Sequence, residues 1–264
     1  MRPVLFDLFG VIPVSSFGVF LLLGFFAGIT IARRTARERL DLDPNQVLDL
    51  SLYLIIAGIV AGRLGFIVAN PEAFLTDPAR MLTLWRDGGL TYYGALLGGL
   101  WLAWAFAQRW RVAFGALADA YAPALIAGYA VAMIGALLHG LFVGRPTGVP
   151  WAMELFLERR HPAPLYLLAA AAGILAILRA QRHRDLPPGT LLALAVLLQS
   201  VARFAVDVFV DAPAVLGPLT AGQVASGVAV LVCAVVLVRL QRRAPQAAEP
   251  PAGPPPEPPS EVPA

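Results

Sequence analysis

The chain has 264 residues, of which 58% are hydrophobic and only 14% are charged, and its mean hydropathy is +0.71. Soluble domains contain about 45–50% apolar and about 25% charged residues, so this composition excludes an ordinary soluble domain and, over most of the length, disorder. A net charge of +3 comes with 20 basic residues, all of them arginine. These arginines separate apolar segments instead of forming a stripe, which argues against nucleic acid as a partner, and the single cysteine, Cys233, excludes an internal disulfide scaffold.

Seven apolar segments follow one another along the chain and predict an all-α, polytopic membrane protein. A helix that crosses about 30 Å of hydrocarbon needs roughly 20 mostly apolar residues. Segments of this kind cover residues 16–32, 50–69, 89–108, 121–142, 164–178, 189–209 and 219–238. The first begins late and has no early basic cluster, so we expect a retained span and not a cleaved signal peptide.

Arginine placement predicts the orientation of these spans, because positive residues concentrate on the cytoplasmic side of a membrane. With the N-terminus outside, twelve arginines fall in cytoplasmic segments and six in outer segments, which favours an N-out, C-in topology. We therefore expect a transmembrane domain over residues 1–243. Residues 244–264 are rich in proline, and their composition predicts a disordered cytoplasmic tail.

Two arginines fall inside predicted spans, where each costs roughly 2.5–3.5 kcal/mol on insertion scales and needs a partner or a wet cavity. Arg63 lies between Gly62 and Gly65, small neighbours that allow close helix approach. Arg203 precedes Asp207 by four residues, so the two side chains share a helix face and can pair. Both arginines fall in the outer halves of their spans. Two alternatives remain for each arginine. Either it binds a ligand, or it has a structural role, in which Arg63 contacts backbone carbonyls and Arg203 forms an ion pair.

The predicted third span begins with a glycine pair and two tyrosines. Gly88 and Gly89 allow a tight backbone approach or a positive φ. Tyr92 and Tyr93 bring phenol hydroxyls to the outer interface. These tyrosines belong either to a functional site or to the aromatic belt that is common at this level of a membrane protein.

The predicted outer segment 144–163 adds charged and titratable side chains, namely Arg145, Glu154, Glu158, Arg159, Arg160 and His161. A guanidinium is a planar fork that suits phosphate oxygens, so arginines gathered at the outer interface indicate an anionic lipid headgroup as the ligand. Arg159 and Arg160 fit a solvated loop better. His139 near the end of the fourth span is either a site residue or a satisfied core histidine, and Cys233 is expected to be a buried, inert thiol.

Six short motifs occur in an order that resembles the bacterial prolipoprotein diacylglyceryl transferases. The most specific covers residues 85–99 (WRDGGLTYYGALLGG) and is similar to the family's run of paired glycines, aromatic residues and glycine that opens the third span. The others are 61–65 (AGRLG), 140–147 (GLFVGRPT), 161–166 (HPAPLY), 203–209 (RFAVDVF) and 219–223 (LTAGQ). The resemblance extends from the first span to the seventh and leaves out only the tail.

The resemblance implies an enzyme of the bacterial inner membrane with its site toward the extracytoplasmic face and no cofactor or metal. The family moves the diacylglyceryl group of phosphatidylglycerol to the lipobox cysteine thiol of a preprolipoprotein, whose signal peptide it binds in the bilayer; a thioether forms and glycerol phosphate departs. By this likeness Arg203 matches an essential arginine, and Tyr93 falls where members carry a catalytic histidine or tyrosine. The implied substrate-binding residues are Arg63, Gly88, Gly89, Gly94, His139, Arg145, His161 and Asp207.

Two stretches depart from the family pattern. Where the family carries Arg-x-Gly-Asn followed by Asn-Gly, residues 133–140 read MIGALLHG. Met133 thus replaces an arginine that contacts the lipid phosphate, and Ala136 and His139 replace the two asparagines. The family's Ser-Gln-Leu-Tyr-Glu appears as APLYL at 163–167.

These departures leave alternatives open. In the first alternative, Arg63, Arg145 or His139 contacts the lipid phosphate in place of the missing arginine. In the second, the chain is a divergent, non-catalytic paralogue that binds phospholipid or lipoprotein signal helices. A small-molecule transporter is a third hypothesis, since polar residues in spans often line pathways. The lack of a visible internal repeat argues against it.

Overall fold

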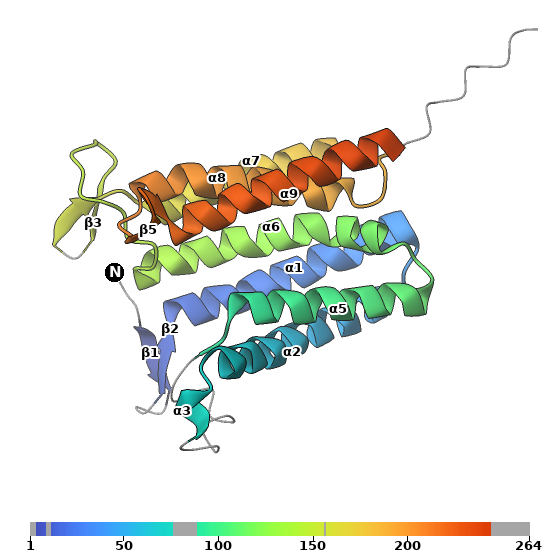
Figure 1. Ribbon diagram of the computed structural model, residues 1–264, viewed down its shortest axis with the longest axis horizontal. Coiled ribbons are helices and arrows are strands. Elements are labelled where there is room, and N and C mark those ends of the chain that lie inside the picture. The colour runs from blue at the N-terminus through green and yellow to red at the C-terminus, as the bar shows by residue number, and fades with distance from the viewer. Residues whose placement is uncertain (1–3, 9–11, 76–88, 156, 244–264) are drawn as a thin grey trace, which may run out of the picture.

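The computed structural model describes residues 4–8, 12–75, 89–155 and 157–243 and consists mainly of helices (Figure 1). The long helices are α1 (Ser16–Leu40), α2 (Pro44–Ala69), α5 (Tyr92–Trp110), α6 (Phe114–His139), α7 (Ala163–Ala180), α8 (Thr190–Val206) and α9 (Ala221–Arg243). Six segments of the described residues are long and apolar enough to cross a membrane, and they correspond to all of these helices except α5. α5 has 19 residues and packs along α2. The prediction of an all-α polytopic membrane protein is confirmed.

The helices lie side by side along the long axis of the molecule. α1 and α6 form the centre, with α2 and α5 on one side and α7, α8 and α9 on the other (Figure 1). Antiparallel hairpins cover one end: β1 (Val4–Leu8) with β2 (Ile12–Ser15), β3 (Met153–Leu155) with β4 (Glu158–Arg160), and β5 (Ala214–Leu216) with β6 (Leu219–Thr220). The short helix α3 (Glu72–Leu75) lies at the same end, which we call the hairpin end. The opposite end, where α9 finishes, is the tail end.

Local capping residues determine where α1 starts and how it turns sharply into α2. The side chain of Ser15 accepts a hydrogen bond from the Gly18 backbone at 3.0 Å and starts α1. Asp41 adopts the left-handed conformation (φ 52°) and ends that helix. Asp43 then accepts from the Asn45 backbone at 2.8 Å and starts α2, so only a few residues separate two antiparallel helices.

Glycines let two helix pairs approach closely. In the α2–α5 pair, a Cβ at Gly94 would overlap the Ala61 carbonyl oxygen, and a Cβ at Gly98 would overlap the Ala61 side chain. In the α1–α6 pair, Gly24 faces Gly128, and a Cβ at Gly24 would lie 2.7 Å from the Gly128 carbonyl oxygen. Small residues at such contacts are typical of helices that associate within a membrane, where packing supplies much of the attraction.

Large apolar side chains are exposed on the outer faces of the helices. Examples from four helices are Phe26, Leu64, Trp101 and Leu231. An apolar surface of this extent would be unfavourable in water, but it suits helices that face lipid. The hydrophobic outer surface therefore agrees with the membrane location.

The predicted spans match the long helices in order, but some boundaries were wrong. The predicted third span starts at residue 89, whereas α5 starts at Tyr92 because Gly89 has a positive φ of 80°. The predicted fourth span reaches residue 142, whereas α6 ends at His139 because Gly140 adopts the left-handed conformation at φ 85°. The three hairpins were not predicted. The N-out orientation stays a prediction, and the predicted tail at 244–264 lies outside the described residues.

Candidate functional site

Arg63 lies between α2 and the segment that leads into α5. Only 5% of its surface is exposed. Its Nη1 donates a hydrogen bond to the Gly89 carbonyl oxygen at 3.2 Å, and its guanidinium carbon lies 5.6 Å and 5.3 Å from the ring centroids of Phe66 and Phe74. Contact with aromatic faces and a carbonyl lowers the cost of a cation in a membrane span. The structure thus has the backbone-carbonyl contact of the structural alternative for Arg63, and ligand binding by this residue stays a prediction.

The glycines of the predicted third-span motif shape the backbone at this point. Gly89 has the positive φ that the sequence predicts, and a Cβ there would lie 2.5 Å from an aromatic ring of α2. Gly94 belongs to the close contact between α2 and α5 described above. Gly88 lies outside the described residues. Of Tyr93, the structure describes the backbone in the first turn of α5 but not the side chain.

Arg203 forms the predicted ion pair with Asp207 near the hairpin end of α8. The Nε atom lies 2.7 Å from Oδ1 of Asp207, which begins a short 3-10 helix, η2 (Asp207–Phe209). The Asp207 side chain is only 4% exposed, whereas the Arg203 side chain is 24% exposed. The guanidinium carbon lies 4.4 Å from the ring centroid of Phe142. A buried carboxylate therefore fixes one edge of a guanidinium that remains partly accessible.

The start of α9 supports this ion pair. The Thr220 backbone donates to Oε1 of Gln223 at 3.0 Å, and the Gln223 backbone donates to Oγ1 of Thr220 at 3.2 Å, which is a capping box. Gly222 lies against Asp207 so closely that a Cβ would overlap the carboxylate. The amino end of α9 carries partial positive charge, so this contact stabilises the buried carboxylate that holds Arg203.

Two buried polar side chains next to Arg203 have unsatisfied hydrogen-bonding atoms. Tyr129 of α6 interacts electrostatically with Arg203 and Asp207 and lies near Gln199, one helical turn before Arg203. Within the described residues, no partner at hydrogen-bond distance and angle meets the Tyr129 hydroxyl or either polar atom of the Gln199 amide. Most buried polar groups are satisfied, so such a cluster is typical of a place where a polar ligand binds.

The connection between α6 and α7 pairs with the chain that follows α8. The Arg145 backbone donates to the Phe209 carbonyl oxygen at 2.7 Å, and Arg145 Nε donates to the Val210 carbonyl oxygen at 3.3 Å. The His161 backbone donates in turn to the Arg145 carbonyl oxygen at 3.1 Å. Arg145 and His161, both predicted site residues, are therefore held beside the segment that follows the Arg203–Asp207 pair.

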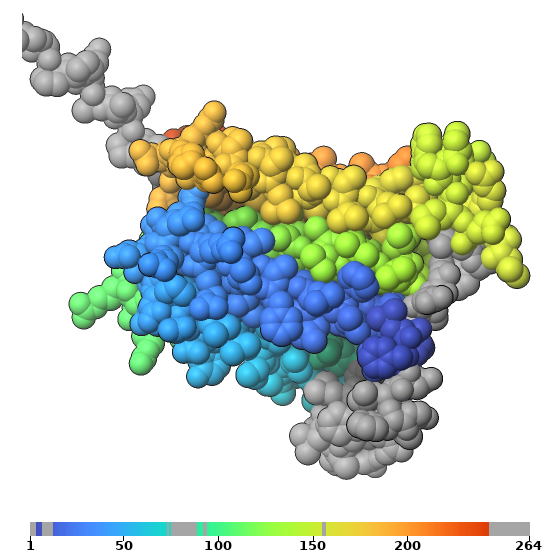
Figure 2. All heavy atoms as spheres, turned by 180° about the vertical axis from the view of Figure 1, so that it is seen from behind, coloured from blue at the N-terminus to red at the C-terminus, as the bar shows by residue number. Residues whose placement is uncertain are grey.

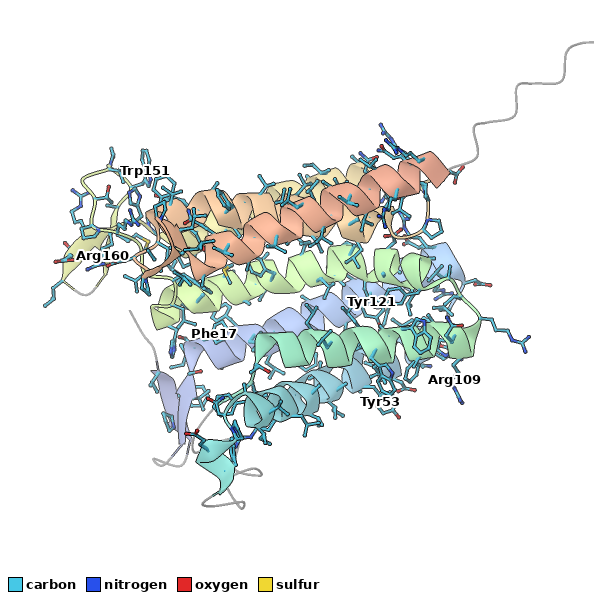
Figure 3. All side chains as sticks on the ribbon, in the orientation of Figure 1. Phe17, Tyr53, Arg109, Tyr121, Trp151 and Arg160 are labelled. Atoms are coloured by element: carbon cyan, nitrogen blue, oxygen red, sulfur yellow. The ribbon has the colours of Figure 1, made fainter. Side chains whose placement is uncertain are left out.

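The His161 side chain belongs to an aromatic cluster. Its ring centroid lies 4.9 Å from that of Phe209, and its Nδ1 lies 3.0 Å from the Tyr166 hydroxyl. The same hydroxyl accepts a hydrogen bond from Nε1 of Trp151 at 2.8 Å, at the hairpin end (Figure 3). Because the indole can only donate, the Tyr166 hydrogen is available to Nδ1, which favours the His161 tautomer that is protonated at Nε2.

Arg160 cross-links the same two segments, in contrast to the solvated role expected for it (Figure 3). Its Nη1 donates to Asp211 and to the Gly144 carbonyl oxygen, each at 3.1 Å, and its Nη2 donates to Glu158 at 2.6 Å. The hydrogen bond to Asp211 is the main cause that raises the pKa of Arg160 above its ordinary value. Arg159 is exposed and donates to a backbone carbonyl, in keeping with a loop residue.

α6 presents apolar packing where the family pattern carries polar residues. Met133, at 4% exposure, and Ala136, at 0%, pack into an apolar cluster with Val206. His139 ends the helix, and its ring centroid lies 6.5 Å from that of Phe17 in α1. Met133, for which the family resemblance implies an arginine, is thus a buried core residue.

The described contacts bring the predicted site residues together in two groups, both toward the hairpin end. The first group surrounds η2 and consists of Arg203, Asp207, Arg145 and His161. The second lies between α2 and α5 and consists of Arg63, Gly89 and Gly94. The central helices α1 and α6 lie between these two helix sets in Figure 1. A single cavity lined by Arg63, Tyr93, Arg145 and Arg203 therefore stays a prediction.

Sequence analysis did not single out Phe142, Tyr129, Gln199 and Gly222 as site residues, although Phe142 and Gly222 lie within two of the quoted motifs. For Gly222 and Gln199, the sequence contains a recognisable spacing pattern. The Thr-x-x-Gln spacing at 220–223 is a capping box, and Gln199 lies four residues before Arg203 on the same helix face. Tyr129 and Phe142 come close only through packing between separate segments, which no local spacing reveals.

Comparison with known proteins identifies relatives over nearly the whole chain. Residues 3–239 match the family described as prolipoprotein diacylglyceryl transferase. A phosphatidylglycerol–prolipoprotein diacylglyceryl transferase of Thermosynechococcus vestitus is 31% identical over 245 residues, with 88% of this chain and 90% of the relative covered. The protein of the same name from Geobacter sulfurreducens is 32% identical, with 91% and 96% covered. The one from Chromohalobacter salexigens is 34% identical, with 77% of each chain covered.

Proposed function

The chain belongs to the prolipoprotein diacylglyceryl transferase family, and from this premise we propose that it transfers the diacylglyceryl group of phosphatidylglycerol to the cysteine thiol of a prolipoprotein. The thiolate sulfur attacks the glyceryl carbon that carries the phosphate ester. A carbon–sulfur bond forms as the carbon–oxygen bond breaks, and glycerol phosphate leaves with the electron pair. The products are a thioether on the prolipoprotein and glycerol phosphate, and the thiol proton is released.

The observation that carries the proposal is the Arg203 guanidinium, fixed by a buried carboxylate yet still partly accessible. A departing phosphate needs fixed positive charge in a site of low dielectric constant. Arg203 binds the phosphate of phosphatidylglycerol through its accessible nitrogens. The Tyr129 hydroxyl and the Gln199 amide, which interact with each other only loosely, as the hydroxyl does with Arg203, supply the remaining hydrogen bonds. These neutral groups replace hydrogen bonds, but not charge, that Met133 does not provide.

The acceptor thiol approaches from the start of α5. A thiol with a pKa near 8.5 must lose its proton before it becomes a good nucleophile, and Tyr93 is the residue that receives or relays it. Arg63, Gly88, Gly89 and Gly94 form the backbone and packing around this position. His139, Arg145 and His161 border the donor lipid on the opposite side.

The proposed acceptor is the lipobox cysteine that follows a prolipoprotein signal peptide. This peptide lies in the bilayer beside the helices, so its cysteine reaches the hairpin end at the depth of the lipid headgroups. With the predicted N-out topology, the hairpin end is extracytoplasmic and the membrane is the inner membrane of a bacterium.

The test is a transfer assay with the purified full-length protein in nanodiscs that contain phosphatidylglycerol. A lipobox peptide with cysteine is the acceptor, and the same peptide with serine in place of cysteine is the control. Mass spectrometry is expected to show the diacylglyceryl adduct on the cysteine peptide alone. Absence of product, under conditions in which the Geobacter sulfurreducens relative converts the peptide, would refute the proposal.

The variant Arg203→Ala tests the role of the guanidinium, with Arg159→Ala, an exposed loop arginine, as the matched control. We expect Arg203→Ala to insert in the membrane and fold but to lose activity, because removal of the side chain takes away the phosphate contact. Arg159→Ala keeps its activity. An Arg203→Ala protein that became unstable but retained its specific activity would show that the residue is structural.

A further inference from the structure

A second arginine-rich site lies at the tail end, far from the Arg203 group along the helices. A pocket of about 860 Å³ opens between α1 and α7, with α6 as its floor and the start of α8 at one side. α1 and α7 each pack against α6. Figure 2 shows the green surface of α6 in the depression between the blue α1 and the yellow α7. The pocket is therefore open to the side of the bundle.

Cations gather on both walls of this pocket. Arg34 and Arg39 come from α1, and Arg179 and Arg182 come from α7 and the turn that follows it. Arg39 Nη2 donates to the Arg182 carbonyl oxygen at 2.9 Å and closes the outer edge of the pocket. Arg182 donates a hydrogen bond through Nε to His183 at 2.7 Å, so this contact leaves its two terminal nitrogens available to a ligand. In the described part of the chain, the structure records no ion pair and no hydrogen bond for the side chain of Arg179.

The two acidic residues of the pocket offset only part of the charge of its four arginines. Asp119 accepts hydrogen bonds from the Gly189 and Leu192 backbones, each at 2.8 Å, so its carboxylate is engaged with the amino end of α8. Glu38 forms no ion pair within 4.0 Å with any described residue. Four arginines thus face two carboxylates, one of which is already bound. An anion is the ligand that this imbalance favours.

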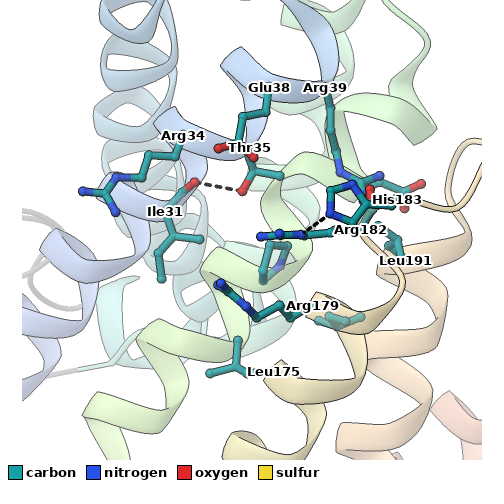
Figure 4. A pocket seen from close by; sticks show the side chains of 13 residues that line it. Ile31, Arg34, Thr35, Glu38, Arg39, Leu175, Arg179, Arg182, His183 and Leu191 are labelled. Carbon is teal, nitrogen blue, oxygen red and sulfur yellow. Dashed lines mark hydrogen bonds between the residues drawn. The ribbon is translucent and has the colours of Figure 1, made fainter.

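The deeper lining of the pocket is apolar. The apolar lining consists of Ile31, Leu175, Leu178 and Leu191, and Leu175 lies below Arg179 in Figure 4. Arg179 and Arg182 extend from the α7 side into the pocket (Figure 4). A polar anion alone would leave this apolar wall uncovered. A phospholipid has a phosphate for the arginines and acyl chains for the apolar wall, so it matches both parts.

We propose that this pocket binds an anionic phospholipid of the leaflet at the tail end, with its phosphate on Arg179 and Arg182 and an acyl chain along Ile31 and Leu175. The bound lipid bridges α1 and α7 across the floor of α6. The site is separate from the catalytic site that we propose at Arg203, and it does not depend on that proposal. It acts as a structural lipid site and not as the source of the transferred group.

The test measures binding of short-chain dihexanoyl phosphatidic acid to the full-length protein in detergent. Phosphatidylcholine of the same chain length and inorganic phosphate are the comparison probes. We expect saturable binding of phosphatidic acid that is weaker by about tenfold or more in Arg179→Gln/Arg182→Gln, because each lost hydrogen bond to a charged group lowers affinity severalfold or more. The matched control Arg184→Gln, an exposed arginine outside the pocket lining, keeps the native affinity.

Three outcomes would overturn the proposal. Equal binding of phosphatidylcholine would remove the requirement for an anionic headgroup. Equal affinity for inorganic phosphate would identify a free-anion site without a role for the apolar wall. Loss of the binding in Arg203→Ala, with no effect of the pocket variants, would place the lipid at the hairpin end. A thermal melt checks that every variant is folded, and the transfer assay reports on the catalytic proposal separately.

Discussion

The variant Tyr129→Phe separates a functional hydroxyl from a structural one. In the folded protein this hydroxyl is buried, and no described residue offers it a hydrogen bond of adequate distance and angle. An unsatisfied buried polar group costs roughly 1–3 kcal/mol, so its removal should leave the free energy of unfolding unchanged or raise it by about 1 kcal/mol. If the hydroxyl instead donates to the phosphate of the bound lipid, the variant loses a hydrogen bond to a charged group.

Such a hydrogen bond contributes about 1.5–3 kcal/mol, which corresponds to a decrease of roughly 10- to 150-fold in the rate of diacylglyceryl transfer. The expected signature is therefore a protein at least as stable as the native one and much less active. Thermal unfolding in detergent and the peptide transfer assay measure the two quantities on the same preparation.

Tyr121→Phe is the matched control, since Tyr121 lies on the same helix and its hydroxyl is satisfied. That hydroxyl lies 2.9 Å from Oγ of Ser51 and donates to the Val47 carbonyl oxygen at 3.2 Å. Its removal should lower stability by about 1 kcal/mol and leave transfer unchanged. The reasoning is refuted if Tyr129→Phe is destabilised like the control, or if it transfers lipid at the native rate.

Two further predictions use glycines with matched controls nearby. Gly222→Ala places a Cβ on the Asp207 carboxylate and should lower transfer activity at least tenfold by displacing the partner of Arg203, whereas Gly227→Ala, whose Cβ would lie 3.9 Å from the nearest atom, should be close to native in the same assay. Gly98→Ala places a Cβ on a side chain of the facing helix and should lower the free energy of unfolding of the solubilised protein by about 1–3 kcal/mol. A Cβ at position 99 would meet no atom within 4 Å, so Gly99→Ala should leave this free energy unchanged. Equal effects within either pair would contradict the geometry described here.

The helices were predictable because hydrophobic length alone defines a membrane span. Their ends were less predictable, since they depend on single backbone conformations. Gly89 and Gly140 both have positive φ, and each shifts a boundary by about three residues from the apolar pattern. The β3–β4 hairpin has three residues in each strand, too few for an alternating pattern to be recognised.

The site was predictable where the two partners lie four residues apart along the chain. The four-residue spacing of Arg203 and Asp207 predicts their ion pair, and the structure has it at 2.7 Å. The contribution of Tyr129 depends on how α6 packs against α8, and the contribution of Gly222 depends on where α9 begins. Both contributions depend on the tertiary arrangement. Where no local spacing pattern links two residues, a single sequence does not show that they come together.

The two arginines within the spans offset the cost of burial in different ways, and this difference separates their roles. Arg63 is almost completely enclosed by a carbonyl and two aromatic rings, so a phosphate could reach it only if that packing opened. Arg203 is held through Nε by a carboxylate that is itself anchored against α9, and a quarter of its side chain is accessible. The Arg203 guanidinium is therefore accessible to an anion without any change in its support, whereas Arg63 is suited to hold α2 and the chain before α5 in place.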